Sequence, residues 1–198
     1  MITLDLATLK PAVLVVDMQA VFVSPDGPFA NASAGPLVAA LNPFLAGCRG
    51  HGVPVIFSNY LLRDDLRDAG LLRTSPAAQH ITESAPSAVV DQRIVLAPTD
   101  LKVRHSRPSA LFRSELLAVL ADLGVDALIL TGVSVNNAIS STARDAFAHD
   151  IPALVVRDCV GAAPWEPAEL LASYFDALAT WTAEVADAAD VLERLAAR

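Results

Sequence analysis

The chain has 198 residues, of which 54% are hydrophobic and only 6% aromatic, and its formal net charge is −8. This length favours a single domain over residues 1–198, and a composition led by Ala, Val and Leu is typical of parallel sheets covered by helices on both faces. The negative charge argues against a nucleic acid or an anionic membrane surface as the main partner.

The first apolar run, over residues 12–16, ends in Asp17 and predicts a buried parallel strand. Apolar residues at helical spacing then predict a helix over 36–49. Pro43 interrupts that span, so that either it kinks one longer helix or it begins a shorter one. A second strand is expected over 53–57.

Residues 60–91 show no sustained hydrophobic period and contain two Ser-Pro or Ala-Pro breaks. A loop of this length in a compact domain often covers a site or a subunit contact. The alternative is that the segment contains short helices that a single sequence does not reveal.

In the second half of the chain, strands are predicted over residues 93–96, 101–103, 126–131 and 153–156. Helices are predicted over residues 115–123, 136–149 and 167–180, with a last amphipathic stretch ending at Arg198. Ser114 is a candidate N-cap, and Phe147 is expected to face inward. Because strands and helices alternate, we predict an α/β fold, a three-layer α/β/α sandwich with a mostly parallel sheet.

Two cysteines, Cys48 and Cys159, are too few for a disulfide framework. The N-terminal run lacks the basic region and cleavage site of a signal peptide, and no apolar run approaches the ~20 residues needed to span a bilayer. We therefore expect a soluble cytoplasmic protein. Without a metal-binding, phosphate-loop or nucleophile-elbow motif, we predict neither a metal nor another cofactor.

The stretch from Thr131 to Ala146 organises the expected site, because a strand there stops near a Gly and turns into a helix. Such a turn lies at the carboxyl edge of the sheet and leaves helix N–H groups pointing outward. Where the turn could carry a nucleophile, the chain has Ala138. Asp17 ends the first strand and is a candidate proton donor or acceptor, or else an ordinary turn cap. His105 ends another strand and is either a crevice acid or base or a surface residue.

Each of the other candidate residues has a structural interpretation as well as a functional one. Arg104 and Arg107 could hold a carboxylate or phosphate, or form surface ion pairs. Cys159 could reach the crevice or be inert packing. Trp165 could wall a pocket, or anchor an interface or the core.

Three motifs in order carry a resemblance to a known family: residues 15–19 with Phe22, residues 105–112, and residues 131–146. Together they resemble the isochorismatase-like (cysteine hydrolase) superfamily over roughly residues 10 to 180. The resemblance implies a Rossmann-like isochorismatase fold and a catalytic Asp, Lys and Cys.

Carried over by position, the catalytic set falls on Asp17, His105 and Ala138, so only the Asp is retained. An Ala cannot form a thioester. The true isochorismatase branch also lacks the Cys and carries Gly there, and it cleaves a vinyl ether with the Asp as acid. Tyr60 and Ser134 stand about where that branch places a substrate-holding Gln and Tyr.

The resemblance thus predicts a hydrolase that acts on a small molecule without a covalent thioester, with Asp17 as acid or base and His105 in place of the lysine. Helix N–H groups near Ala138 would bind an anionic group. The alternatives are an inactive ligand-binding relative and a Cys-to-Ala variant of a C–N amidohydrolase. A homodimer or larger homo-oligomer is also implied. The predicted substrate-binding residues are Gln19, Phe22, Tyr60, Arg107, Ser134, Asn137 and Trp165.

Overall fold

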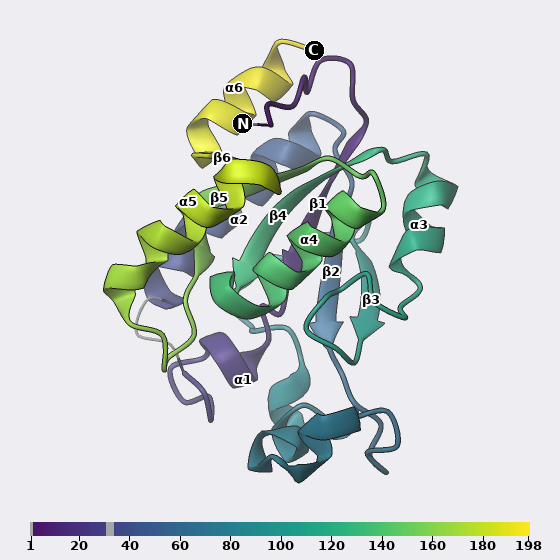
Figure 1. The fold of residues 1–198 in the computed structure, drawn as a ribbon, viewed down its shortest axis with the longest axis vertical. Helices are drawn as coiled ribbons and strands as arrows, with labels where there is room; N and C mark the ends of the chain where they lie inside the picture. Colours follow the sequence, from purple (N-terminus) through teal and green to yellow (C-terminus); the bar gives the residue numbers. More distant parts are fainter. Residues whose placement is uncertain (1, 31–33) are drawn as a thin grey trace.

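A computed structural model describes residues 2–30 and 34–198 and has a six-stranded parallel sheet at its centre (Figure 1). The strands lie side by side in the order β3-β2-β1-β4-β5-β6. Their bounds are β1 (Pro11–Val16), β2 (Val55–Tyr60), β3 (Leu101–His105), β4 (Ala127–Val133), β5 (Ala153–Gly161) and β6 (Glu184–Ala186).

Helices cover both faces of this sheet and confirm the predicted three-layer α/β/α sandwich. The α-helices are α1 (Ala20–Val23), α2 (Ala34–Gly50), α3 (Leu116–Leu123), α4 (Ser140–Ala148), α5 (Leu171–Trp181) and α6 (Ala188–Ala196). The short helical turns are η1 (Gly70–Thr74), η2 (Pro76–His80), η3 (Pro86–Ala88), the π-type η4 (Val135–Ile139) and η5 (Ala168–Leu170). Helices α2 and α6 pack on one face, and α3, α4 and α5 pack on the other.

The central strand β1 shows why the sheet needs two helical layers. All six of its residues are buried. Val13 and Val15 point into the core shared with α2 and α6, whereas Leu14 and Val16 point into the core shared with α3 to α5. Each such side chain contributes about 1.5–3 kcal/mol when it leaves water, so an uncovered face would lose most of the stabilising free energy.

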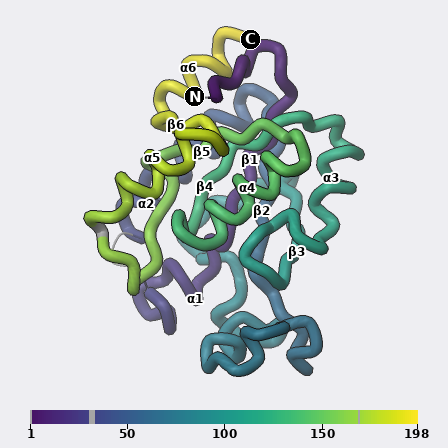
Figure 2. The backbone as a smooth tube through the Cα atoms, in the orientation of Figure 1, coloured from purple at the N-terminus to yellow at the C-terminus, as the bar shows by residue number. Residues whose placement is uncertain are grey.

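The two ends of the chain lie together at the edge of the sheet opposite the carboxyl ends of the strands (Figure 2). The Arg194 guanidinium donates to the Leu4 carbonyl at 2.5 Å, and that of Arg198 donates to the Leu9 carbonyl at 3.0 Å. No helix in the described ranges combines the length and hydropathy needed to cross a membrane.

The prediction of a strand over residues 93–96 is wrong. The segment is irregular, because the Asn42 side chain of α2 takes over its backbone hydrogen bonds. The Asn42 amide donates to the Arg93 carbonyl, and its oxygen accepts from the Val95 N–H, both at 2.9 Å. A side chain that satisfies a backbone donor and acceptor removes the need for a neighbouring strand.

Other predictions differ in detail. Helix α2 runs through Pro43 as one helix, and the segment over 60–91 holds the three short turns η1 to η3. Phe147 was expected to face inward, but it is 53% exposed. The short edge strand β6 was not predicted.

The order of the strands reverses between β1 and β4, and the carboxyl ends of parallel strands at such a point form a natural crevice. Gly132 allows the two strands to meet there. Its φ is +108°, and a Cβ on it would lie 2.0 Å from the Val16 carbonyl oxygen. The backbone after β1 and the backbone after β4 are thus brought to the same edge of the sheet.

Candidate functional site

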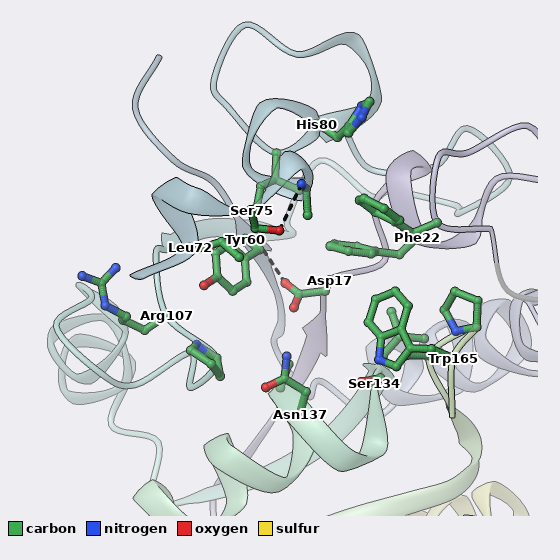
Figure 3. Close-up of a pocket in the computed structure, with 18 of the residues that line it drawn as sticks. Asp17, Phe22, Tyr60, Leu72, Ser75, His80, Arg107, Ser134, Asn137 and Trp165 are labelled. Atoms are coloured by element: carbon green, nitrogen blue, oxygen red, sulfur yellow. Dashed lines mark hydrogen bonds between the residues drawn. The ribbon is translucent and has the colours of Figure 1, made fainter. Parts of the chain in front are cut away.

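A cavity of about 860 Å³ opens at the carboxyl edge of the sheet, between the strand ends and the segment that follows β2 (Figure 3). Asp17 lies in its centre, below Tyr60 and above Asn137 in this view. The remaining walls come from residues 69–81, the start of η4, and residues 162–165. The ends of β1 and β4 at the reversal point therefore contribute to one cavity.

Asp17 has one carboxylate oxygen held by the protein. Its Oδ1 accepts from the Tyr60 N–H at 3.0 Å and lies 2.9 Å from His105 Nε2. In the described part of the chain, Oδ2 has no side-chain or backbone donor, and the residue lines the cavity. The backbone φ of 54° is one that Asp tolerates better than most residues and turns the side chain off the strand axis. Asp17 therefore presents one free oxygen to a ligand.

His105 is only 2% exposed and lies behind Asp17, outside the cavity lining. Its Nδ1 is 2.6 Å from the Arg107 carbonyl oxygen, which can only accept, so Nδ1 carries a hydrogen. The contact between Nε2 and Asp17 then needs a second shared proton. Burial works to lower the pKa of His105, but the Asp17 charge, the hydrogen bond to it and the Arg107 carbonyl together raise that pKa above its usual value. The direction of this shift and the Nδ1 contact both favour a protonated His105 ring that donates from Nε2 to Asp17 Oδ1.

Tyr60 covers this pair from the cavity side. Its ring centroid is 5.0 Å from that of His105, and its hydroxyl donates to the Ser106 carbonyl at 3.3 Å. Burial, and next the Asp17 charge, raise the pKa of Tyr60 to about 12, so the phenol stays protonated. Tyr60 thus excludes water from His105 while it lines the cavity.

Gln19, predicted to bind substrate, does not line the cavity. It is fully buried, and its amide donates to the carbonyls of Tyr60 and Ala88 at 3.1 and 2.6 Å. Its Oε1 accepts from the Tyr60 N–H at 2.8 Å. Because both ends of the amide are used by the backbone, Gln19 holds the end of β2 in place, and the structure does not bring its side chain to the cavity.

Ala138 lies where the cavity meets the start of η4. The N–H groups of Asn137 and Ile139 both donate to the Ser134 carbonyl, at 3.2 and 3.1 Å. Ala138 lines the cavity, and its methyl side chain offers no nucleophile there.

Neither thiol replaces the missing nucleophile. Cys48 and Cys159 are both fully buried in the core on the α2 and α6 side of the sheet. Burial raises the pKa of Cys48 to about 12 and raises that of Cys159 as well, so both stay protonated thiols. The suggestion that Cys159 reaches the crevice is wrong.

Ser134 and Trp165 lie on the cavity wall as predicted, and a carboxylate links their segments. The Ser134 hydroxyl donates to one oxygen of Glu166 at 3.2 Å, and the Ala163 N–H donates to the other at 2.8 Å. Glu166 thus ties the turn that carries Trp165 to the end of β4. Phe22 and Asn137 also line the cavity.

Arg107 lines the cavity edge, and Nη1 of its guanidinium is engaged by the protein. It donates to the carbonyls of Asp68 and Ser106. In Figure 3 the guanidinium points away from Asp17. Arg104 forms exposed ion pairs with Asp68 and Glu83, in line with the surface reading.

Sequence reasoning missed the part of the wall that lies above Asp17. It is formed by Phe29, which follows α1, and by apolar and imidazole side chains of η1, η2 and the residue after it, namely Leu71, Leu72, His80 and Ile81. The only sequence signal was the long aperiodic segment itself. The described residues include no group of three or more His, Cys, Asp or Glu side chains placed to hold a metal ion.

Comparison with known proteins gives a consistent match. The Isochorismatase domain family matches residues 11–190. The chain is 28% identical to maleamate amidohydrolase of Pseudomonas putida strain KT2440 over 169 residues, which cover 84% of this chain and 78% of that protein. It is 30% identical to enterobactin synthase component B of Escherichia coli strain K12 over 76% of this chain, which spans about half (52%) of that longer protein.

Solved structures share the fold. The cysteine hydrolase from Pseudomonas syringae pv. phaseolicola 1448A superposes with a TM-score of 0.92 at 24% identity, over 100% of this chain and 97% of that one. N-carbamoylsarcosine amidase from Thermoplasma acidophilum gives a TM-score of 0.76 at 25% identity, over 91% of this chain and 97% of that one. The arrangement of strands and helices around the cavity is therefore shared with this group of proteins.

Proposed function

The chain belongs to the isochorismatase family of hydrolases, and from this premise we propose that it hydrolyses a small molecule by direct attack of water, without a covalent thioester. The observation that carries the proposal is the state of Asp17. One carboxylate oxygen is bonded to the Tyr60 N–H and to His105, and the other is left to the cavity. A carboxylate fixed in this way is oriented for proton transfer before a ligand arrives.

The first candidate bond is a carbon–nitrogen bond of an amide, since several relatives are named amidohydrolases or amidases. Asp17 Oδ2 takes a proton from water while the water oxygen attacks the carbonyl carbon. The Ala138 N–H donates to the oxyanion that forms, as other backbone donors do in acyl transfer. Asp17 then returns the proton to the leaving nitrogen as the carbon–nitrogen bond breaks. His105 stays protonated throughout and stabilises the carboxylate.

The second candidate bond is the ether bond of a vinyl ether, and Ala138 favours it. By the resemblance, the branch that cleaves vinyl ethers also lacks a nucleophile at this position. This route starts from the acid form of Asp17, which would give its proton to the terminal vinyl carbon. Water would then add to the resulting oxocarbenium carbon and return one proton to Asp17. The hydroxyl proton of the hemiketal would pass to the ether oxygen as that oxygen leaves as the alcohol. Both candidates place the proton on the same carboxylate, so one variant tests them together.

The test is a panel of amides, imides and vinyl ethers assayed by NMR with the wild type and Asp17→Asn. We expect Asp17→Asn to lower kcat/KM at least ~100-fold, which is the typical contribution of a positioned general acid or base. Asp26→Asn, which removes an exposed carboxylate outside the cavity, is the matched control and should stay within about twofold. Equal turnover by wild type and Asp17→Asn would remove Asp17 from the mechanism. A folded wild type that turns over nothing in the panel would favour the inactive ligand-binding relative.

A further inference from the structure

The cavity is large and mostly apolar relative to the short polar molecules named in its relatives. Its volume of about 860 Å³ falls in the range that accommodates drug-sized ligands. Leu72 and Ile81 from the segment after β2 and Val133 and Ala138 from the end of β4 and η4 all contribute apolar surface to the cavity. A ligand of only a few heavy atoms would leave most of this apolar surface in contact with water.

Aromatic rings form one continuous wall beside Asp17. The Phe22 and Phe29 rings are stacked with centroids 6.4 Å apart, and the Phe29 ring meets that of Trp165 edge-on at 6.1 Å. His80 contacts the other edge of Phe29 at 5.6 Å. Figure 3 shows Phe22 and Trp165 on the same side of the Asp17 carboxylate. Such a wall provides stacked and edge-on positions for a further ring.

The charges beside this wall disfavour an anion. Asp17 presents its carboxylate to the cavity, and Arg107 is the only arginine or lysine among the described lining residues. Nη1 of Arg107 donates to the carbonyls of Asp68 and Ser106, and the guanidinium points away from Asp17 in Figure 3. An anion bound beside the aromatic wall would lose its hydration next to the Asp17 carboxylate, with the Arg107 charge directed elsewhere.

From this combination we propose that the site selects an uncharged, aromatic substrate of about two rings, with the ring system against Phe22 and Trp165 and the scissile bond at Asp17. This inference rests on the proposed function, since it names the substrate class of the same site. A substrate of this class would distinguish the protein from hydrolases that act on small carboxylates such as maleamate.

Two fluorescent probes with the same ring system test the inference. N-phenyl-1-naphthylamine is neutral, and 8-anilinonaphthalene-1-sulfonate adds one negative charge to it. We expect the full chain to bind the neutral probe at least ~10-fold more tightly, measured by titration of probe fluorescence. Equal affinity for the two probes, or tighter binding of the sulfonate, would overturn the inference.

Three variants locate the binding. Trp165→Ala should weaken binding of the neutral probe about tenfold, which is the effect expected when a central aromatic contact is lost. Trp181→Ala removes the other tryptophan, which is 76% exposed and outside the cavity lining, and should leave the affinity unchanged. Asp17→Asn should strengthen sulfonate binding, because it removes the like charge. Equal losses in Trp165→Ala and Trp181→Ala would place the probe elsewhere and reject the proposed site.

Binding and turnover fail independently in these measurements. If the protein prefers the neutral probe, and Trp165→Ala weakens this binding, but no substrate in the panel is hydrolysed, the inferred ligand class stands and the proposed reaction is rejected. If the protein hydrolyses small anionic amides and binds both probes equally, the proposed reaction stands and the inferred ligand class is overturned.

Discussion

At the scale of the residue, His105 is the main departure from the Asp, Lys and Cys set that the resemblance implies. It does not line the cavity, so in the proposed mechanism it acts through Asp17 as a positioning residue. Its Nδ1–H is bonded to the Arg107 carbonyl, which fixes the ring so that Nε2 faces the carboxylate. An imidazolium loses its charge much closer to neutral pH than an ammonium, so this site should be more sensitive to alkaline pH than one built with a lysine.

Stability should depend on pH through His105. Its folded-state pKa is raised above the ordinary value of 6.5. The protonated ring therefore stabilises the fold fully below about pH 6.5, and this contribution is lost as the pH rises through the folded-state pKa. The melting temperature of the wild type minus that of His105→Gln should be largest in mildly acidic buffer and shrink in alkaline buffer. A difference that grows with rising pH would contradict the assigned imidazolium.

The same titration should appear in catalysis. We expect kcat/KM of the wild type to fall at alkaline pH as His105 loses its proton. The variant His105→Lys should move this alkaline limb of the pH profile towards the lysine range near pH ~10. A purely structural role for His105 would lower activity without moving the limb.

At the scale of the element, the site depends on how closely β4 approaches β1. Asp17 and the start of η4 come from different strands, and the contact between Gly132 and Val16 sets their separation. A bulge between β4 and β5 at Leu130 and Gly132 accompanies this approach. In the proposed mechanism, the turn after β4 places the Ala138 N–H and a small side chain beside the carboxylate.

Gly132→Ala should disrupt this approach. The added Cβ would lie 2.0 Å from the Val16 carbonyl oxygen, at a φ that L-residues rarely adopt. We expect a loss of about 3 kcal/mol or more in the free energy of unfolding, measured by urea denaturation. Gly35→Ala in α2 is the matched control, because its Cβ would meet no atom within 4 Å and Ala favours a helix by about 1 kcal/mol. A mild effect at Gly132 would mean that the two strands can separate without cost.

Elements with strong local signals could be predicted, and those defined by distant contacts could not. The run that forms β1 is apolar throughout, and β4 begins with four apolar residues before Thr131 and Gly132, so the local sequence predicts that both strands are buried. Residues 93–96 have a similar local pattern, but Asn42, about fifty positions earlier, binds their backbone instead. Strand β6 has three half-buried residues and no periodic signal.

At the scale of the whole molecule, the site likewise contains residues that a local sequence signal predicts and residues that only distant contacts bring together. Asp17 and His105 could be identified because each ends a strand at the carboxyl edge of a parallel sheet. The aromatic wall could not, since Phe29 and Trp165 meet only after the segments that follow β1 and β5 fold towards each other. The side chain of Gln19 could not be placed from the sequence either, because its position is beside the site while its side chain turns back into the protein.

The central claim is hydrolysis by water at Asp17 without a thioester, and the most direct measurement is turnover by a cysteine-free protein. The double variant Cys48→Ala, Cys159→Ala removes both thiols of the chain. Once its fold is verified by circular dichroism, we expect its kcat on the best panel substrate to stay within about threefold of the wild type. Adding Asp17→Asn to it should abolish turnover. A folded cysteine-free protein that has lost activity would show that a thiol takes part and would contradict the account.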